Sequence, residues 1–167
     1  MSNYLNYSYE QLKKFCNDCF MKFGFTEDES NIITDVLLLS DLYGIESHGM
    51  QRLARYHKGI EKGLIKVDAK PEVVFETPVS AVIEGNDGMG QLISHKAMNI
   101  AIEKAKEIAL QHAGLKENEV SRLRAEKDRD DGRTKYDVEF QQGRMEYDYE
   151  IHAETGKILK AEKDYDD

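Results

Sequence analysis

Residues 91–114 read QLISHKAMNIAIEKAKEIALQHAG, and this stretch decides how the chain is organised. Its apolar side chains recur at the spacing of one helix face until Gly114; they are Ile93, Ala97, Ile100, Ala101, Ala105, Ile108, Ala109 and Ala113. At 1.5 Å per residue such a helix is about 35 Å long, which is long for a chain of 167 residues. The pattern therefore predicts either one long helix or two helices joined end to end.

Three more helices are predicted upstream, over about residues 8–24, 26–44 and 47–61. The first two begin with capping boxes, in which a Ser or Thr is followed three residues later by Gln or Glu; the pairs are Ser8 with Gln11 and Thr26 with Glu29. Ser47 is expected to cap the third helix. The first part of the chain is thus predominantly helical.

Strand patterns occur on both sides of the long helix. Short β-branched or apolar runs at 72–76 and 81–84 flank a turn at Thr77-Pro78 and predict a hairpin. After Gly114, apolar and charged residues alternate between turns at Asp131-Gly132, Gln142-Gly143 and Thr155-Gly156. This alternation predicts four antiparallel strands in a meander, whose apolar face must be covered by the helix that ends near Ala113.

The predicted fold class is therefore α+β. It comprises an N-terminal helical unit with a short β-hairpin, a long connecting helix, and a C-terminal helix packed on a four-stranded antiparallel sheet. Charge density supports two units, because the first 110 residues carry 28 charged side chains and the last 57 carry 27. We place the predicted domains at residues 1–104 and 105–167, with the boundary inside the long helix.

The net charge of −9 leaves no basic footprint for phosphate neutralisation, so nucleic-acid binding is not expected. The longest uninterrupted apolar run, residues 36–39, is far below the roughly 20 residues that cross a bilayer. The N-terminal sequence MSNYLNYSYE has neither a basic n-region nor an apolar h-region. We therefore expect no membrane association and a cytoplasmic location.

His48, Arg52 and Tyr56 are spaced by four residues, so a helix that begins at Ser47 would project all three from one face. A guanidinium group binds a carboxylate through two hydrogen bonds, and an imidazole exchanges a proton near neutral pH. These side chains suit a small acid substrate. The alternative interpretation is that Tyr56 belongs to the core and that His48 and Arg52 are solvated.

Other motifs have plainer interpretations. The segment 85–91 is either a phosphate-binding loop without the usual glycine order or a simple loop. Cys16 and Cys19 form a C-x-x-C pair on an apolar stripe, which favours two buried thiols over a redox or metal pair. The acidic run at 128–132 has the wrong pattern for an EF-hand and is interpreted as a charged hairpin turn. No metal site is predicted.

Ser47-His48-Gly49, Arg52-Leu53 and Tyr56, followed by residues 87–91 (DGMGQ), resemble the type-2 malate/L-lactate dehydrogenase family over about residues 5–107. The resemblance implies hydride transfer between NAD or NADP and a 2-hydroxy or 2-keto acid, and a dimeric protein. By matching positions, His48 would be catalytic, and Ser47, Arg52 and Tyr56 would bind the substrate. The family's later motifs, a second histidine motif and most of the dinucleotide site, have no counterpart here. We therefore expect a catalytically incomplete fragment that forms a homo-oligomer.

The segments at 112–114, 136–140, 146–151 and 153–158 resemble a PepSY domain, which the helix-plus-meander pattern also fits. PepSY domains resemble peptidase propeptides, so the resemblance implies a peptidase as a partner and a location usually outside the cytoplasm. Residues 104–110 suit either family, and a fusion through a shared helix would explain the step in charge density. The alternative function is therefore a non-enzymatic module that binds or inhibits a peptidase.

Overall fold

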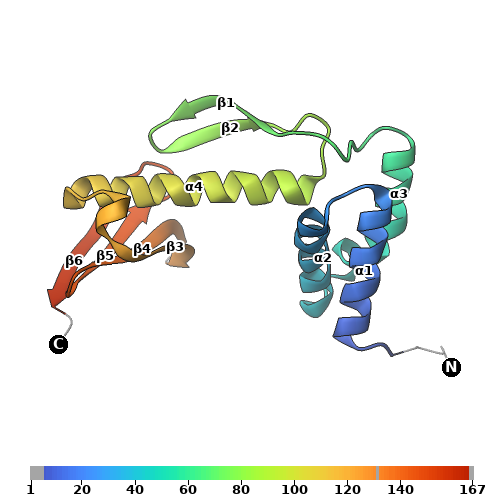
Figure 1. Ribbon diagram of the computed structural model, residues 1–167, viewed down its shortest axis with the longest axis horizontal. Coiled ribbons are helices and arrows are strands. Elements are labelled where there is room, and N and C mark those ends of the chain that lie inside the picture. The colour runs from blue at the N-terminus through green and yellow to red at the C-terminus, as the bar shows by residue number, and fades with distance from the viewer. Residues whose placement is uncertain (1–5, 131, 166–167) are drawn as a thin grey trace. The chain divides into compact units, whose positions relative to one another are not determined.

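The computed structural model describes residues 6–130 and 132–165 and confirms the α+β class (Figure 1). The helices are α1 (Tyr9–Phe23), α2 (Glu27–Leu42), α3 (Leu53–Glu61) and α4 (Gly90–Ala113), with 3-10 turns η1 (Glu46–His48), η2 (Met50–Arg52) and η3 (Glu117–Glu119). The strands are β1 (Glu72–Thr77), β2 (Ser80–Glu84), β3 (Ser121–Asp130), β4 (Arg133–Gln142), β5 (Met145–His152) and β6 (Ile158–Tyr165).

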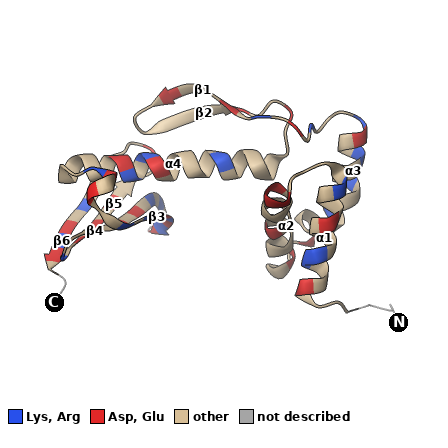
Figure 2. Ribbon diagram, viewed as in Figure 1, with Lys and Arg blue, Asp and Glu red and all other residues tan. Residues whose placement is uncertain are grey.

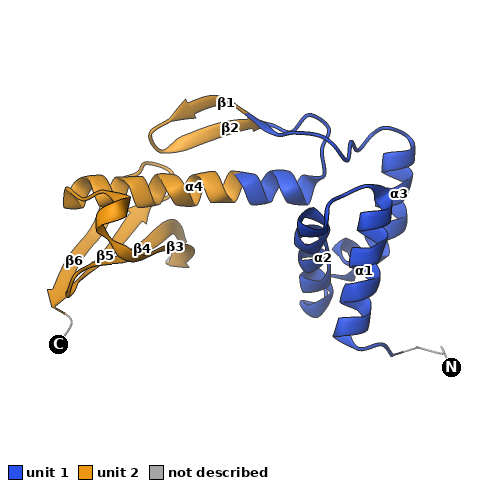
Figure 3. Cartoon of the chain, viewed as in Figure 1, with its two compact units in different colours: residues 1–72, 84–96 blue, residues 73–83, 97–167 orange. Residues whose placement is uncertain are grey.

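The chain divides into two compact units, which we call unit 1 (residues 1–72 and 84–96) and unit 2 (residues 73–83 and 97–167) (Figure 3). Helix α4 contributes residues to both, and the hairpin formed by β1 and β2 belongs to unit 2 for most of its length. The division at residue 104 stays a prediction about the origin of the two domains.

Unit 1 begins with two capped helices, as predicted. Ser8 and Thr26 each accept the backbone N–H three residues along the chain, and the side chains of Gln11 and Glu29 accept the N–H groups of the capping residues in return. Gly24 then ends α1 in the left-handed conformation, with φ of 110°. The unit's core consists of five buried side chains, which are Phe20, Phe25, Ile33, Leu37 and Met89.

The predicted start of the third helix is wrong. Helix α3 begins at Leu53 and not after a cap at Ser47. The Ser47 hydroxyl caps no helix and lies 2.9 Å from Nδ1 of His48. Instead, Oδ2 of Asp41 accepts the Met50 N–H at 2.8 Å and holds the chain in two successive 3-10 turns. A contact from another helix therefore replaces the local cap that the sequence suggested.

Helix α4 is one continuous helix from Gly90 to Ala113, which decides between the two alternatives for this stretch. Its C-terminal half packs on the four-stranded sheet of unit 2, as predicted. Ala105, Ala109 and Leu110 are buried there with the inward side chains of the strands, which are Tyr136, Val138, Phe140, Tyr149 and Ile151. Burial of these apolar side chains stabilises unit 2.

The sheet has the order β3-β4-β5-β6 with every pair antiparallel, so the predicted meander is confirmed. Gly143 and Gly156 occupy the left-handed region in two of its turns, with φ of 62° and 67°. Asp131, part of the predicted first turn, lies outside the described residues.

The β1–β2 hairpin is attached to unit 2 through Lys104 of α4. The Lys104 side chain is only 10% exposed, and its Nζ donates to the Thr77 carbonyl oxygen and pairs with Oε1 of Glu76, both at 2.7 Å. The hairpin tip also approaches Gly156, because a Cβ placed on this glycine would lie 2.2 Å from Cγ1 of Val79 and 3.2 Å from Cδ1 of Ile108. A side chain at position 156 would therefore push the hairpin tip away.

We predict that Gly156→Ala destabilises unit 2 more than Gly143→Ala. Both variants place alanine at positive φ, which costs about 1 kcal/mol, but a Cβ on Gly143 meets nothing within 4 Å. The clash with Val79 should add about 1–3 kcal/mol, measured as the difference in denaturant unfolding free energy. Equal losses in the two variants would show that the hairpin tip does not pack on this turn.

Candidate functional site

The predicted site residues lie on η1, η2 and α3 of unit 1. Ser47 and His48 are exposed on η1, whereas Arg52 at the end of η2 is half-buried. Nε of Arg52 donates to the backbone oxygen of Ser47, so the guanidinium folds back over the turn that carries His48. This contact links the two candidate side chains through the backbone.

Gly49 lies between these residues and is buried. A Cβ at this position would lie 1.7 Å from Oδ1 of Asp41, whose other oxygen holds the Met50 N–H. The φ of Gly49 is −89°, so the glycine is needed for room and not for a left-handed backbone. The Ser-His-Gly sequence thus lets a carboxylate of α2 pass close enough to shape the turn.

Tyr56 belongs both to the core and to the candidate site. Its ring is half-buried and lies 6.4 Å from the Phe20 ring, centroid to centroid. Its hydroxyl accepts a hydrogen bond of 2.9 Å from Nε2 of Gln91 in the first turn of α4. Gln91 was not a predicted site residue, although it ends the second family motif. The two motifs that carry the resemblance therefore meet in space at this hydrogen bond.

The prediction that His48, Arg52 and Tyr56 share one helix face is wrong, because the first two precede α3. Arg52 and Tyr56 line one cavity of about 440 Å³, and the structure brings these two together. His48 is not among the side chains that line it. The remaining lining residues are Arg55, Lys58, Gly59, Lys62, Leu64 and Ile65.

The loop at 85–91 does not fit a dinucleotide. The Gly88 N–H donates to the Gly85 oxygen at 2.9 Å, and the Leu92 and Ile93 N–H groups donate to the Met89 oxygen, so these amides are already occupied. The cavity beside the loop measures about 90 Å³, well below the several hundred cubic ångströms typical of a ligand site. The loop instead serves packing, because Met89 is 2% exposed.

The other sequence motifs also have structural roles. Cys16 is completely buried and Cys19 is partly buried, and both are free thiols. Asp128 lies in β3 and pairs with Lys135 at 3.7 Å. Within residues 6–130 and 132–165, no group of three His, Cys, Asp or Glu side chains is arranged to hold a metal ion, and no helix there is long and apolar enough to cross a membrane.

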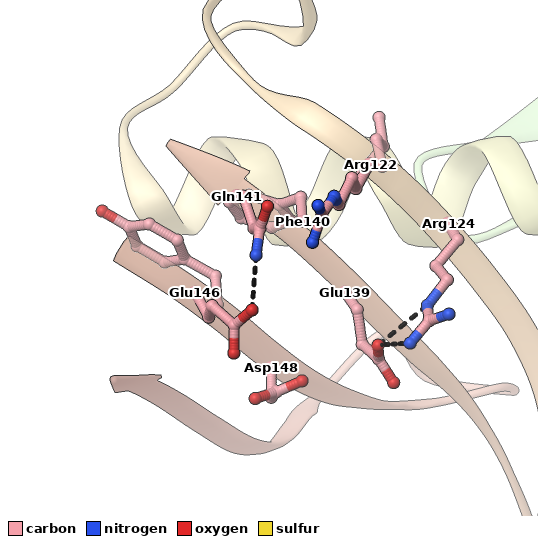
Figure 4. Close-up of a pocket in the computed structure, with 9 residues that line it drawn as sticks. Arg122, Arg124, Glu139, Phe140, Gln141, Glu146 and Asp148 are labelled. Carbon is pink, nitrogen blue, oxygen red and sulfur yellow. Dashed lines mark hydrogen bonds and ion pairs between the residues drawn. The ribbon is translucent and has the colours of Figure 1, made fainter. Parts of the chain in front are cut away.

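Unit 2 has a cavity of its own, of about 470 Å³, on the sheet (Figure 4). It opens where β3 changes register against β4, between Ser121 and Arg124, and Arg122 there adopts a left-handed φ of 54°. Its charged lining residues are Arg122, Arg124, Glu139, Glu146 and Asp148. Burial, followed by the neighbouring Glu139, raises the pKa of the Asp148 carboxyl above its ordinary value.

Comparison with known proteins agrees with the two resemblances. Residues 7–119 match the family model of malate/L-lactate dehydrogenase, and residues 99–162 match that of the PepSY peptidase propeptide and YPEB domain. The first match covers more than half of this chain, so the chain belongs to the malate/L-lactate dehydrogenase family. A PepSY domain follows, and the two matches overlap within α4 and the residues after it.

Individual relatives support this assignment. The chain is 39% identical to a malate dehydrogenase of Pyrococcus abyssi over 108 residues, which are 65% of this chain and 30% of the relative. It is 39% identical to an L-sulfolactate dehydrogenase of Methanocaldococcus jannaschii over 101 residues, 60% of this chain and 29% of the relative. The chain thus spans about 30% of the length of these curated relatives.

The structural likeness extends further along the chain. The malate dehydrogenase structure from Pyrococcus horikoshii OT3 superposes with a TM-score of 0.62 and 27% identity, covering 91% of this chain and 51% of that one. Residues beyond the sequence match therefore also find counterparts in the dehydrogenase fold.

The buried thiol gives a pH-dependent prediction. Burial raises the pKa of Cys16 from 9.0 to about 11. Between these two values the folded chain keeps the thiol proton that the unfolded chain has lost. The free energy of unfolding that the protonated thiol contributes is therefore complete below pH 9 and is lost as the pH rises from 9 to 11. Across this interval, we expect the free energy of unfolding to fall by up to about 2 kcal/mol more in the wild type than in Cys16→Ala. Urea unfolding measures this difference. Parallel pH curves would contradict a buried, protonated thiol.

Proposed function

We propose that unit 1 carries the acid-binding half of a 2-hydroxy acid oxidoreductase site of the malate/lactate type. The observation that carries the proposal is that Arg52 and Tyr56 line one cavity. Gln91 of the second family motif donates a hydrogen bond to the Tyr56 hydroxyl. Malate and sulfolactate dehydrogenases share this part of the sequence. Complete enzymes of this family use NAD or NADP as the hydride partner.

The side chains present can bind an acid and move a proton. The backbone oxygen of Ser47 occupies Nε of Arg52, which leaves the two terminal guanidinium nitrogens to hold a carboxylate. The Tyr56 hydroxyl accepts from Gln91 and keeps its own proton to donate. His48 has its Nδ1 beside the Ser47 hydroxyl, which leaves Nε2 to exchange a proton with a substrate.

Hydride transfer by this chain alone is not part of the proposal. The described residues at the strand–loop–helix junction do not fit NAD(P), and the relatives are more than three times as long as the segment that they share with this chain. We infer that this chain by itself is catalytically incomplete as a dehydrogenase and associates with a second copy of itself in the cytoplasm. A fusion within α4 would have joined it to the PepSY domain.

The acid-binding role predicts that Arg52→Lys weakens the binding of L-malate and pyruvate. Lysine cannot form the two parallel hydrogen bonds of a guanidinium group, so we expect about a tenfold loss of affinity. Calorimetric titration of the full chain measures this loss, and Arg144→Lys, in an exposed turn of unit 2, is the matched control. No binding by the wild type at millimolar acid would contradict the role, and turnover with NADH would contradict the incompleteness.

A second candidate function is supported by the unit 2 cavity and the PepSY match at 99–162. The bulge in β3 carries Arg122 into the cavity in a backbone conformation that costs a non-glycine residue about 1–2 kcal/mol. Strained residues of this kind cluster at functional sites. We propose that this part of the sheet contacts a peptidase.

The peptidase role predicts opposite effects of Arg122→Gly on stability and on binding. Relief of the left-handed strain should stabilise unit 2 by about 1 kcal/mol, while loss of the guanidinium should weaken inhibition of a thermolysin-type metallopeptidase. Urea unfolding and a peptidase assay give the two readouts, with Arg144→Ala as the control. A wild type that neither inhibits nor binds the peptidase would reject this function and leave the acid site untouched.

A further inference from the structure

Arg122 places an unpaired positive charge in the cavity of unit 2. Its side chain points across the cavity toward Phe140 and Gln141 (Figure 4). Over the residues that the structure describes, its guanidinium group forms neither an ion pair nor a hydrogen bond. Because its backbone adopts the left-handed φ of 54° at the register shift of β3, this cation is held in a conformation that non-glycine residues rarely adopt.

Asp148 places an unpaired negative charge in the same cavity. It lies on β5, directly opposite Glu139 of β4. Within residues 6–130 and 132–165 its carboxylate forms no ion pair and accepts no hydrogen bond. Burial and then the neighbouring Glu139 raise the pKa of this carboxyl, as expected for an anion without a cation in contact. A positive group brought by a ligand would stabilise the charged carboxylate.

The neighbouring polar side chains of the cavity are already paired. Charges of both signs lie along the strands of this sheet (Figure 2). Nε of Arg124 donates to Oε2 of Glu139 at 2.8 Å, and Nε2 of Gln141 donates to Oε1 of Glu146, as the dashed lines in Figure 4 show. Since these four side chains satisfy one another, the unpaired charges of the cavity are one guanidinium and one carboxylate.

Apolar side chains complete the lining. Leu123, Phe140 and Tyr147 line the cavity together with the charged groups. The Phe140 and Tyr147 rings stack with their centroids 4.8 Å apart and an angle of 12° between their planes. The volume of about 470 Å³ lies within the range of small-molecule sites. A ligand that fits this lining carries both charges and an apolar group.

We propose that the cavity binds a zwitterion of the α-amino acid class, with Arg122 holding its carboxylate and Asp148 holding its ammonium group. A guanidinium group binds a carboxylate through two parallel hydrogen bonds, and an ammonium group donates to a carboxylate. A simple anion would leave Asp148 uncompensated, and a simple cation would leave Arg122 uncompensated. The apolar lining selects an amino acid with an apolar or aromatic side chain. The inference requires neither acid binding in unit 1 nor contact with a peptidase.

The test is calorimetric titration of the full chain with L-phenylalanine and three analogues. Phenethylamine lacks the carboxylate, hydrocinnamate lacks the ammonium group, and N-acetyl-L-phenylalaninamide carries neither charge. We expect L-phenylalanine to bind at least about tenfold more tightly than each analogue, because it alone compensates both charges of the cavity.

Two variants assign the charges of the ligand to the two side chains. Arg122→Gln should weaken the binding of L-phenylalanine and hydrocinnamate about tenfold and leave that of phenethylamine unchanged. Asp148→Asn should weaken the binding of L-phenylalanine and phenethylamine and leave that of hydrocinnamate unchanged. Arg144→Gln and Glu154→Gln remove the same charges from exposed turns outside the cavity and should bind as the wild type does.

Titration with L-phenylalanyl-L-phenylalanine distinguishes two sources of this chemistry. Weaker binding of the dipeptide assigns a free amino acid as the ligand, and tighter binding assigns a short peptide; both assignments require the opposite selectivities of the two variants. Undetectable binding of both zwitterions, or equal binding of N-acetyl-L-phenylalaninamide, overturns the inference. If the chain inhibits a peptidase but binds neither zwitterion, the peptidase function stands and the zwitterion site fails.

Discussion

Ala105 and Ala109 of α4 are almost completely buried, with 2% and 0% of their surface exposed, in the same apolar cluster as Val138 and Ile151 of the four-stranded sheet. The same helix begins at Gly90, directly after Met89, which is buried in the core of unit 1. One helix must therefore supply apolar side chains to two separate cores. This requirement explains the apolar stripe along its whole length and the absence of a Pro-rich or Gly-rich linker between the units.

Local signals in the sequence predicted those parts of the fold that depend only on residues close together in the chain. Capping boxes predicted the starts of α1 and α2, and alternation of apolar and charged residues predicted the meander, because both patterns act within a few residues. The start of α3 was missed because Asp41, eight residues before Gly49, sets it through space. Similarly, the 85–91 segment was interpreted as a loop, and its glycines gave no sign that Met89 is a core residue.

The site shows the same division between local and distant causes. The spacing of four residues predicted Arg52 and Tyr56 on one helix face; the helix starts later than assumed, and the two side chains line one cavity. The hydrogen bond from Gln91 to Tyr56 joins residues 35 positions apart, so periodicity could not predict it. The family motifs contained both residues, and their joint occurrence is explained by this contact. The Tyr56 ring packs beside Phe20 of the core, while its hydroxyl is hydrogen-bonded to Gln91. A place in the core and a place in the candidate site are therefore compatible for this residue.

Charge is compensated differently in the two units. On the unit 2 sheet, Lys135 pairs with Glu150, Asp137 and Asp128 at 2.7, 3.2 and 3.7 Å, and the hydrogen bond that Lys135 donates to Glu150 raises the pKa of Lys135. Arg124 likewise pairs with Glu139. Cations of the acidic sheet are thus used for cross-strand pairing. On α3, in contrast, Arg55, Lys58 and Lys62 line a cavity to which no carboxylate among the described residues contributes.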